Sequence, residues 1–189
     1  MRRIRLTIAY DGTNYRGWQI QQPTAAHPEG SVPTIQGALQ LALGQLLPKE
    51  AVHGAAPEKS PDPQTLEHAA GEPAAVVTAT APDQVGEVTG PGILPVVGAS
   101  RTDSGVHALG NVACFDTEST IPAANFPKAI NRYLPADIRV MQADEVSMDF
   151  HPRFVPHEKC YEYRIDHGRV ANPLTRLYAY HYTNPLDLE

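Results

Sequence analysis

The sequence is poor in the residues that cross-link or metallate small proteins. Only two of its 189 residues are cysteines, Cys114 and Cys160, and neither lies in a Cys-x-x-Cys motif or at a Cys/His ligand spacing. This scarcity argues against both a disulfide framework and a structural zinc site. Because free cysteines are among the most frequently buried residues, both thiols are predicted to be buried and inert.

Long hydrophobic runs are also missing. No apolar stretch approaches the ~20 residues that a membrane-spanning helix needs. The first residues, Met1 to Arg5, are followed by an alternating pattern and not by the apolar block of a signal peptide. We therefore expect a cytoplasmic protein with no membrane partner.

The chain lacks the basic excess that is typical of nucleic-acid-binding proteins, because its formal net charge is −6. Residues 49–92 contain seven acidic and two basic side chains, a net −5 of that total of −6. The same segment is rich in proline and alanine and shows no long apolar period, which predicts a flexible acidic insertion. The rest of the chain is close to neutral and is free to carry a positive face.

Clear hydrophobic periods flank this segment. Apolar residues alternate with other residues over 4–10, which predicts a strand, and recur at helical spacing over 35–46, after Thr34 as N-cap and before Pro48. Beyond the insertion the pattern predicts strands at 93–97, 111–116, 138–143 and 161–166, and a helix at 125–133 capped by Asn125.

The order of these elements predicts an α+β fold. Strand, helix, strand, strand, helix, strand is the ferredoxin-like βαββαβ order, an antiparallel sheet with helices on one face. We expect residues 1–146 to form this amino-terminal subdomain, with 49–92 as its insertion. Residues 147–189 are expected to begin a second subdomain that is incomplete, because the chain stops at Asn184–Glu189, where another helix would start.

One run combines charge with a sharp turn. If the strand at 93–97 continues to Asp103, then Arg101 and Asp103 point to the same face, because side chains two apart in a strand do so. A guanidinium beside a carboxylate favours its ionised form, which suits a nucleophile. Gly105 would let the chain turn directly afterwards. The alternative from local sequence is a surface Arg/Asp pair followed by an ordinary turn.

The same run resembles the active-site motif of the TruA-type tRNA pseudouridine synthases, Gly-Arg-Thr-Asp-Ala-Gly-Val-His-Ala, with Ser100 for the first glycine and Ser104 for the alanine. Further stretches resemble that family in the same order, and with this run they cover nearly the whole chain outside the insertion. They are Tyr10–Gln19, Thr34–Leu39, and Phe150–Phe154 followed by Lys159–Tyr163.

The resemblance implies a pseudouridine synthase fold whose second half is truncated, and an isomerase that needs neither cofactor nor metal. Its substrate would be a uridine in the anticodon arm of tRNA, and the full-length protein would be a homodimer. Asp103 would be the catalytic nucleophile, and Arg101 would orient that carboxylate or fill the base stack emptied by flipping. Tyr161 would pack against the target base, with Tyr163 and Ile165 of the same strand face buried beneath it.

Several other polar residues are candidates for contact with RNA. His107 and Arg153 are candidate substrate contacts, and the basic residues at 153, 159, 164, 169 and 176 are candidate phosphate contacts. A solvated face is the alternative for each of them. His107, His151 and His157 have no third ligand at a metal-site spacing, so no metal is assigned to them.

Two other functions compete with the synthase. The chain would be an inactive RNA-binding remnant if its missing half is essential. More remotely, Asp103-Ser104-Gly105 is also the Asp-Ser-Gly triplet of aspartic proteases. That triplet normally follows apolar residues, whereas Arg101 and Thr102 precede it here.

Overall fold

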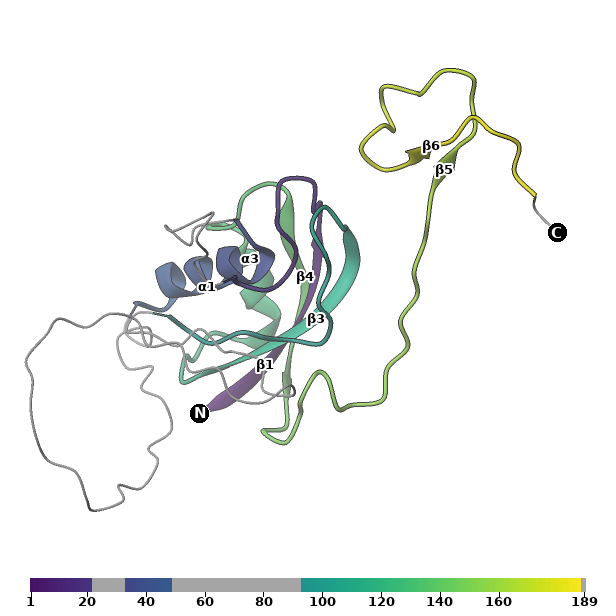
Figure 1. Cartoon of the computed structure of the whole chain (residues 1–189). Coiled ribbons are helices and arrows are strands. Elements are labelled where there is room, and N and C mark those ends of the chain that lie inside the picture. Colours follow the sequence, from purple (N-terminus) through teal and green to yellow (C-terminus); the bar gives the residue numbers. More distant parts are fainter. Residues whose placement is uncertain (22–32, 49–92, 188–189) are drawn as a thin grey trace, which may run out of the picture. The chain divides into compact units, whose positions relative to one another are not determined.

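The computed structural model describes residues 1–21, 33–48 and 93–187 (Figure 1). The chain divides into two compact units, the first ending at Val155 and the second beginning at Pro156, and each is considered by itself. The segment 49–92, predicted to be an insertion, lies outside the described residues. The division into subdomains at residue 146 stays a prediction.

The first unit is built on a four-stranded antiparallel sheet whose strands lie in the order β2-β3-β1-β4. β1 is central and pairs with β3 on one side and with β4 on the other (Figure 1). In chain order the elements are β1 (Arg2–Tyr10), α1 (Ile35–Leu46), β2 (Val97–Gly98), β3 (Ala108–Thr117), the 3-10 helix η1 (Ala123–Asn125), α3 (Phe126–Ile130) and β4 (Ile138–Val146).

The central strand and the long helix form as their patterns predict. The alternating residues Ile4, Leu6 and Ile8 of β1 are fully buried, because successive side chains of a strand point to opposite faces. In α1 the apolar stripe packs into the same core cluster as these residues and as the buried residues of α3, which places both helices on one face of the sheet. Thr34 caps α1 by accepting a hydrogen bond from the Gly37 amide at 3.2 Å.

Two elements are shorter than predicted. The strand expected at 93–97 is reduced to β2, because Pro95 has no amide hydrogen to donate to a sheet. The helix expected at 125–133 consists of η1 and α3 and ends at Ile130. Asn125 makes no side-chain cap bond, so its predicted role is wrong: its backbone is already helical, whereas an N-cap residue is normally extended.

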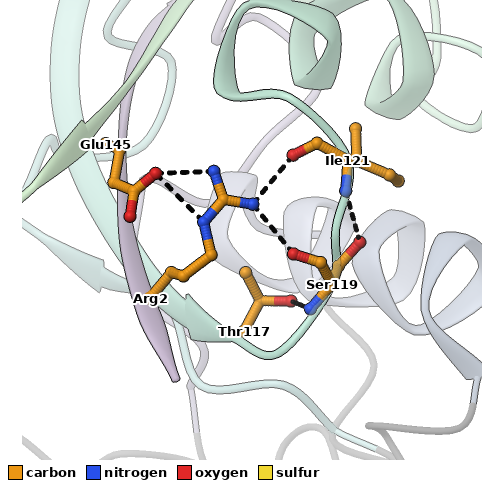
Figure 2. Close-up of polar contacts among 5 residues, drawn as sticks. All are labelled: Arg2, Thr117, Ser119, Ile121 and Glu145. Carbon is orange, nitrogen blue, oxygen red and sulfur yellow. Dashed lines mark hydrogen bonds and ion pairs between the residues drawn. The ribbon is translucent and has the colours of Figure 1, made fainter.

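Arg2, at the start of β1, forms hydrogen bonds with the end of β4 and with the segment that follows β3 (Figure 2). Its guanidinium donates from Nε and Nη2 to Oε2 of Glu145 on β4, at 3.0 and 2.6 Å. Its Nη1 donates to the carbonyl oxygens of Ser119 and Ile121, at 2.8 and 3.0 Å, in the segment that follows Thr117 at the end of β3. The Arg2 guanidinium lowers the pKa of the Glu145 carboxyl below its ordinary value.

In the second unit, β5 (Ile165–Asp166) and β6 (Tyr180–His181) form a parallel pair of two residues each. The strand predicted at 161–166 is therefore wrong except for its last two residues. Tyr163 is 88% exposed and Ile165 51% exposed, which contradicts their predicted burial. The physical reason is that so short a pair provides no layer, within the described part of this unit, to cover that face.

The two cysteines differ. Cys114 is buried, as predicted, whereas Cys160 is exposed because it lies in the extended start of the second unit. In the described part of the chain, no helix has both the length and the apolar character needed to cross a bilayer.

Candidate active site

Asp103 lies in the loop that joins β2 to β3, and its side chain is exposed. The strand does not continue from β2 to this residue, so the argument that Arg101 and Asp103 share a strand face is wrong. Within residues 93–187 and the other described ranges, no ion pair joins these two side chains. The carboxylate is therefore placed by the backbone of its loop, and the role of Arg101 stays a prediction.

The loop between β1 and α1 holds the backbone on both sides of Asp103. The amide of Trp18 donates to the carbonyl of Thr102 at 3.0 Å, and the amide of Gly105 donates to the carbonyl of Tyr15 at 3.2 Å. The Ser104 hydroxyl donates to the same Tyr15 carbonyl at 3.3 Å. The residues before and after Asp103 are thus fixed to one neighbouring segment, which leaves the carboxylate projecting between two anchored points.

Two glycines allow this close approach. A Cβ on Gly17 would lie 2.3 Å from the Thr102 carbonyl oxygen, and the backbone of Gly17 has a φ of +89°. A Cβ on Gly12 would lie 2.0 Å from the carbonyl oxygen of Val106. Real Cβ contacts are never this short, so any larger residue at either position would push the two loops apart.

The loop between β1 and α1, called the clamping loop below, is itself hydrogen-bonded to Asp137, just before the start of β4. The Tyr15 hydroxyl donates to Oδ1 of Asp137 at 2.7 Å, and the Asp11 amide donates to the Asp137 carbonyl at 2.9 Å. Burial, together with the hydrogen bond to the Asp137 carboxylate, raises the pKa of the Tyr15 phenol. The phenol therefore remains neutral and serves as a donor throughout the physiological pH range.

A chain of hydrogen bonds, partly buried, ends on the residues that precede Asp103. The Tyr10 hydroxyl is 2.9 Å from the Thr102 hydroxyl, and the Asn111 amide nitrogen donates to Tyr10 at 3.3 Å and to the Ser100 carbonyl at 3.2 Å. Neither Tyr10 nor Asn111 is among the site residues predicted from the sequence. The only signal in the sequence was that each is a polar group at a position where its strand alternation requires a buried side chain.

His107 faces back toward the clamping loop. Its Nδ1 lies 3.0 Å from Oδ1 of Asp11 and accepts a hydrogen bond from the Gly12 amide at 3.2 Å. One nitrogen cannot accept and donate at once, so Nδ1 accepts from Gly12 when it carries no hydrogen and donates to Asp11 when it carries one. In either case His107 links the loop after β1 to the loop that contains Asp103. Its predicted contact with substrate stays a prediction.

Arg153 also reaches the strand that precedes Asp103, since its Nε donates to the carbonyl of Gly98 at 3.0 Å. Its amide donates to Nδ1 of His151, whose ring stacks on Phe154 with centroids 4.3 Å apart. Asp103, Arg101, His107 and Arg153 thus all come from the first unit. Tyr161 is 71% exposed and belongs to the second unit.

No group of three or more His, Cys, Asp or Glu side chains is arranged to hold a metal ion within the ranges that the structure describes.

Comparison with known proteins bears directly on this loop. The family model described as tRNA pseudouridine synthase matches residues 6–155, a range that includes both loops around Asp103. A protein named tRNA pseudouridine synthase A from Moorella thermoacetica is 36% identical over 185 residues, which cover 98% of this chain and 55% of that protein.

Two other proteins of the same name show the same extent of similarity. The protein from Solibacter usitatus is 37% identical over 187 residues, 99% of this chain and 57% of its own length. The protein from Lacticaseibacillus casei is 34% identical over 189 residues, 100% of this chain and 56% of its own length. The chain spans about half the length of these curated relatives. It belongs to the TruA-type tRNA pseudouridine synthase family, as the four sequence motifs predicted.

Proposed function

We propose that this chain carries the catalytic aspartate of a tRNA pseudouridine synthase and acts on uridine in the anticodon arm of tRNA. The observation that carries the proposal is the placement of Asp103: an exposed carboxylate between two backbone points, Thr102 and Gly105, that are both bonded to the loop between β1 and α1. This loop lies inside the range that matches the family model.

The proposed chemistry needs an exposed and well-placed carboxylate. A stacked uridine must first leave the helix, because its reacting atoms are otherwise inaccessible. Asp103 then attacks the base or the sugar as a nucleophile, and the bond between N1 of uracil and the ribose breaks. The uracil rejoins the ribose through C5, and the bond between the Asp103 carboxylate and the substrate breaks, which releases the carboxylate. The hydrogen on C5 leaves as a proton, and N1 gains one. No electrons are gained or lost, so the proposal requires no redox partner.

The finer fold assignment is also part of this proposal. The strand order β2-β3-β1-β4, with both helices on one face, supports a ferredoxin-like half of the pseudouridine synthase fold. We infer that residues from 147 onward contribute to a second half. The exposed apolar side chains of the second unit, and the 55% coverage of the relative from Moorella thermoacetica, support this inference.

Several roles of side chains toward tRNA follow from the proposal. Arg101 would orient the Asp103 carboxylate or fill the gap that the flipped base leaves in the stack. Tyr161 would pack against the flipped base, and Arg153 would contact a phosphate of the tRNA. Arg164 has an intramolecular partner already, since its Nε donates to Glu162 at 2.6 Å. A cytoplasmic location and a homodimer of the full-length protein complete the proposal.

The inactive RNA-binding remnant remains the second candidate function. It is favoured by the exposed aromatic residues of the second unit, because the rings of Tyr161 and Tyr163 offer exposed surfaces on which bases can stack. The aspartic protease alternative is withdrawn, since family membership accounts for the Asp-Ser-Gly triplet.

Tritium release separates the two candidates. The substrate is tRNA labelled at C5 of uracil, and the chain is compared with Asp103→Ala and with Asp149→Asn as a control on an exposed carboxylate elsewhere. Release by the wild type and by the control, but not by Asp103→Ala, supports the synthase. Binding of tRNA by all three proteins without release supports the remnant, and absence of both binding and release contradicts both.

A further inference from the structure

We propose that Tyr10 and Asn111 are positioning residues that hold the backbone immediately before Asp103. Neither contacts the proposed nucleophile itself. Their hydrogen bonds end on Ser100 and Thr102, so they would act on Asp103 through the loop. This inference rests on the proposed function, but its structural part can be tested without any catalytic activity.

The side chains of Tyr10, Asn111 and Thr102 come from three different segments of the chain; the first two are buried, and Thr102 is half-buried. Tyr10 is the last residue of β1 and is 4% exposed, and Asn111 lies on β3 and is 8% exposed. Thr102 belongs to the loop between β2 and β3. A polar group buried without a partner costs about 1–3 kcal/mol, so such groups remain where their hydrogen bonds are complete.

Hydrogen bonds link Asn111 to two points of the loop. The Asn111 amide nitrogen has two hydrogens, and it donates one to Tyr10 and the other to the Ser100 carbonyl. The Tyr10 oxygen also lies 2.9 Å from the Thr102 hydroxyl, and either of these two oxygens can be the donor. The result is a chain from Asn111 through Tyr10 to Thr102, with a second branch to Ser100.

The ring of Tyr10 is held independently of its hydroxyl. It contacts the Trp18 ring, with centroids 6.2 Å apart, and Trp18 in turn donates its amide to the Thr102 carbonyl. Burial raises the pKa of the Tyr10 hydroxyl, although its two hydrogen bonds oppose the shift, so it stays protonated at neutral pH. Removing only the hydroxyl would therefore leave the packing intact and release the loop.

Amide hydrogen exchange on the whole chain tests the structural claim. The variants are Tyr10→Phe and Thr102→Val, with Thr102→Ser to keep the hydroxyl. Thr117→Val is the control, because it removes a buried hydroxyl at the far end of β3 that accepts from Ser119. We expect the Trp18 and Gly105 amides to exchange about five- to tenfold faster in the first two variants, as for the loss of one hydrogen bond.

The matched variants decide the outcome. Unchanged rates in Thr102→Ser and Thr117→Val, with faster exchange in Tyr10→Phe and Thr102→Val, support the inference. Unchanged rates at Trp18 and Gly105 in Tyr10→Phe and Thr102→Val overturn it. Equal acceleration in Thr117→Val also overturns it, because the effect would then be general destabilisation.

Kinetics add the link to function. With tritium release as the assay, Tyr10→Phe is expected to lower kcat about tenfold and to leave KM unchanged, because substrate contacts are not removed. An unchanged kcat, or a loss confined to KM, contradicts positioning of Asp103. If the wild-type chain shows no release, the proposed function fails, while the exchange rates still decide whether the bond between the Tyr10 and Thr102 hydroxyls holds the loop.

Discussion

The indole ring of Trp18 lies directly on the backbone of Gly98. A Cβ at residue 98 would be 2.5 Å from the ring, closer than any real contact of this kind. The contact joins the loop after β1 to the end of β2. The first of these segments is hydrogen-bonded to the Asp103 loop, and the second leads into it. The proposed active site therefore depends on packing between segments that are distant in the sequence.

Replacing Gly98 by alanine should displace Trp18. The added methyl group meets a buried ring, and overpacking of this kind typically costs about 1–3 kcal/mol. We expect the free energy of unfolding, measured by urea denaturation, to fall by that amount, with a further loss of tritium release. A variant as stable as the wild type would show that the ring can move without cost.

Gly17 and Gly105 provide a matched pair for the loop contact. Both have positive φ, at +89° and +79°, but a Cβ on Gly17 would meet the Thr102 carbonyl, whereas a Cβ on Gly105 would meet nothing within 4 Å. Gly105→Ala should cost about 1 kcal/mol from backbone strain alone. Gly17→Ala should cost about 2 kcal/mol or more, because strain and collision add.

The measurement for this pair is the urea unfolding midpoint of each variant. Equal destabilisation by the two substitutions would argue that the backbones of the two loops do not touch as described.

Asn131 pairs with β4 through both ends of its amide. Its Nδ2 donates to the Val140 carbonyl at 2.9 Å, and its Oδ1 accepts from the Val140 amide at 2.8 Å. Asn131→Ala should therefore lower the free energy of unfolding by about 1–3 kcal/mol. Asn125→Ala is the control, since Asn125 is exposed and makes no cap bond, and calorimetry should show almost no change for it. The reverse order of the two effects would contradict these contacts.

Acid should weaken the tie between Arg2 and Glu145. The pKa of the Glu145 carboxyl is lower in the folded chain than its ordinary value of 4.5. The folded state therefore gains stability from this pair above that value and loses it as the pH falls through the lower, folded pKa. Unfolding midpoints measured from pH 7 to pH 3 should fall less steeply in Arg2→Gln than in the wild type, and identical slopes would contradict the pairing.

Local patterns predicted some elements because their causes are local. Alternation in β1 and the cap and stripe of α1 depend on residues near one another, and both elements formed where expected. The strand expected at 93–97 is longer than the observed β2, because Pro95 has no amide hydrogen for a sheet although its neighbours are apolar.

The site required contacts that no local pattern contains. Asp103 is predicted as a site residue from its motif alone, but the Tyr10 and Thr102 hydroxyls that meet near its loop are separated by 92 positions. Arg101 was expected to be an ion-pair partner because a continuous strand was assumed, and the loop removed that alignment. Contacts between side chains far apart in the sequence depend on how β1 pairs with β3. The sequence pattern predicts the order of these strands along the chain but not which of their residues face each other.

Nucleoside analysis of the product tests the central claim most directly. Unmodified tRNA is incubated with the wild-type chain or with Asp103→Asn, which keeps the size of the side chain and removes its charge, and the digested nucleosides are separated by chromatography. The account predicts pseudouridine from the wild type and none above background from Asp103→Asn. Equal amounts from both proteins, or none from either, would contradict it.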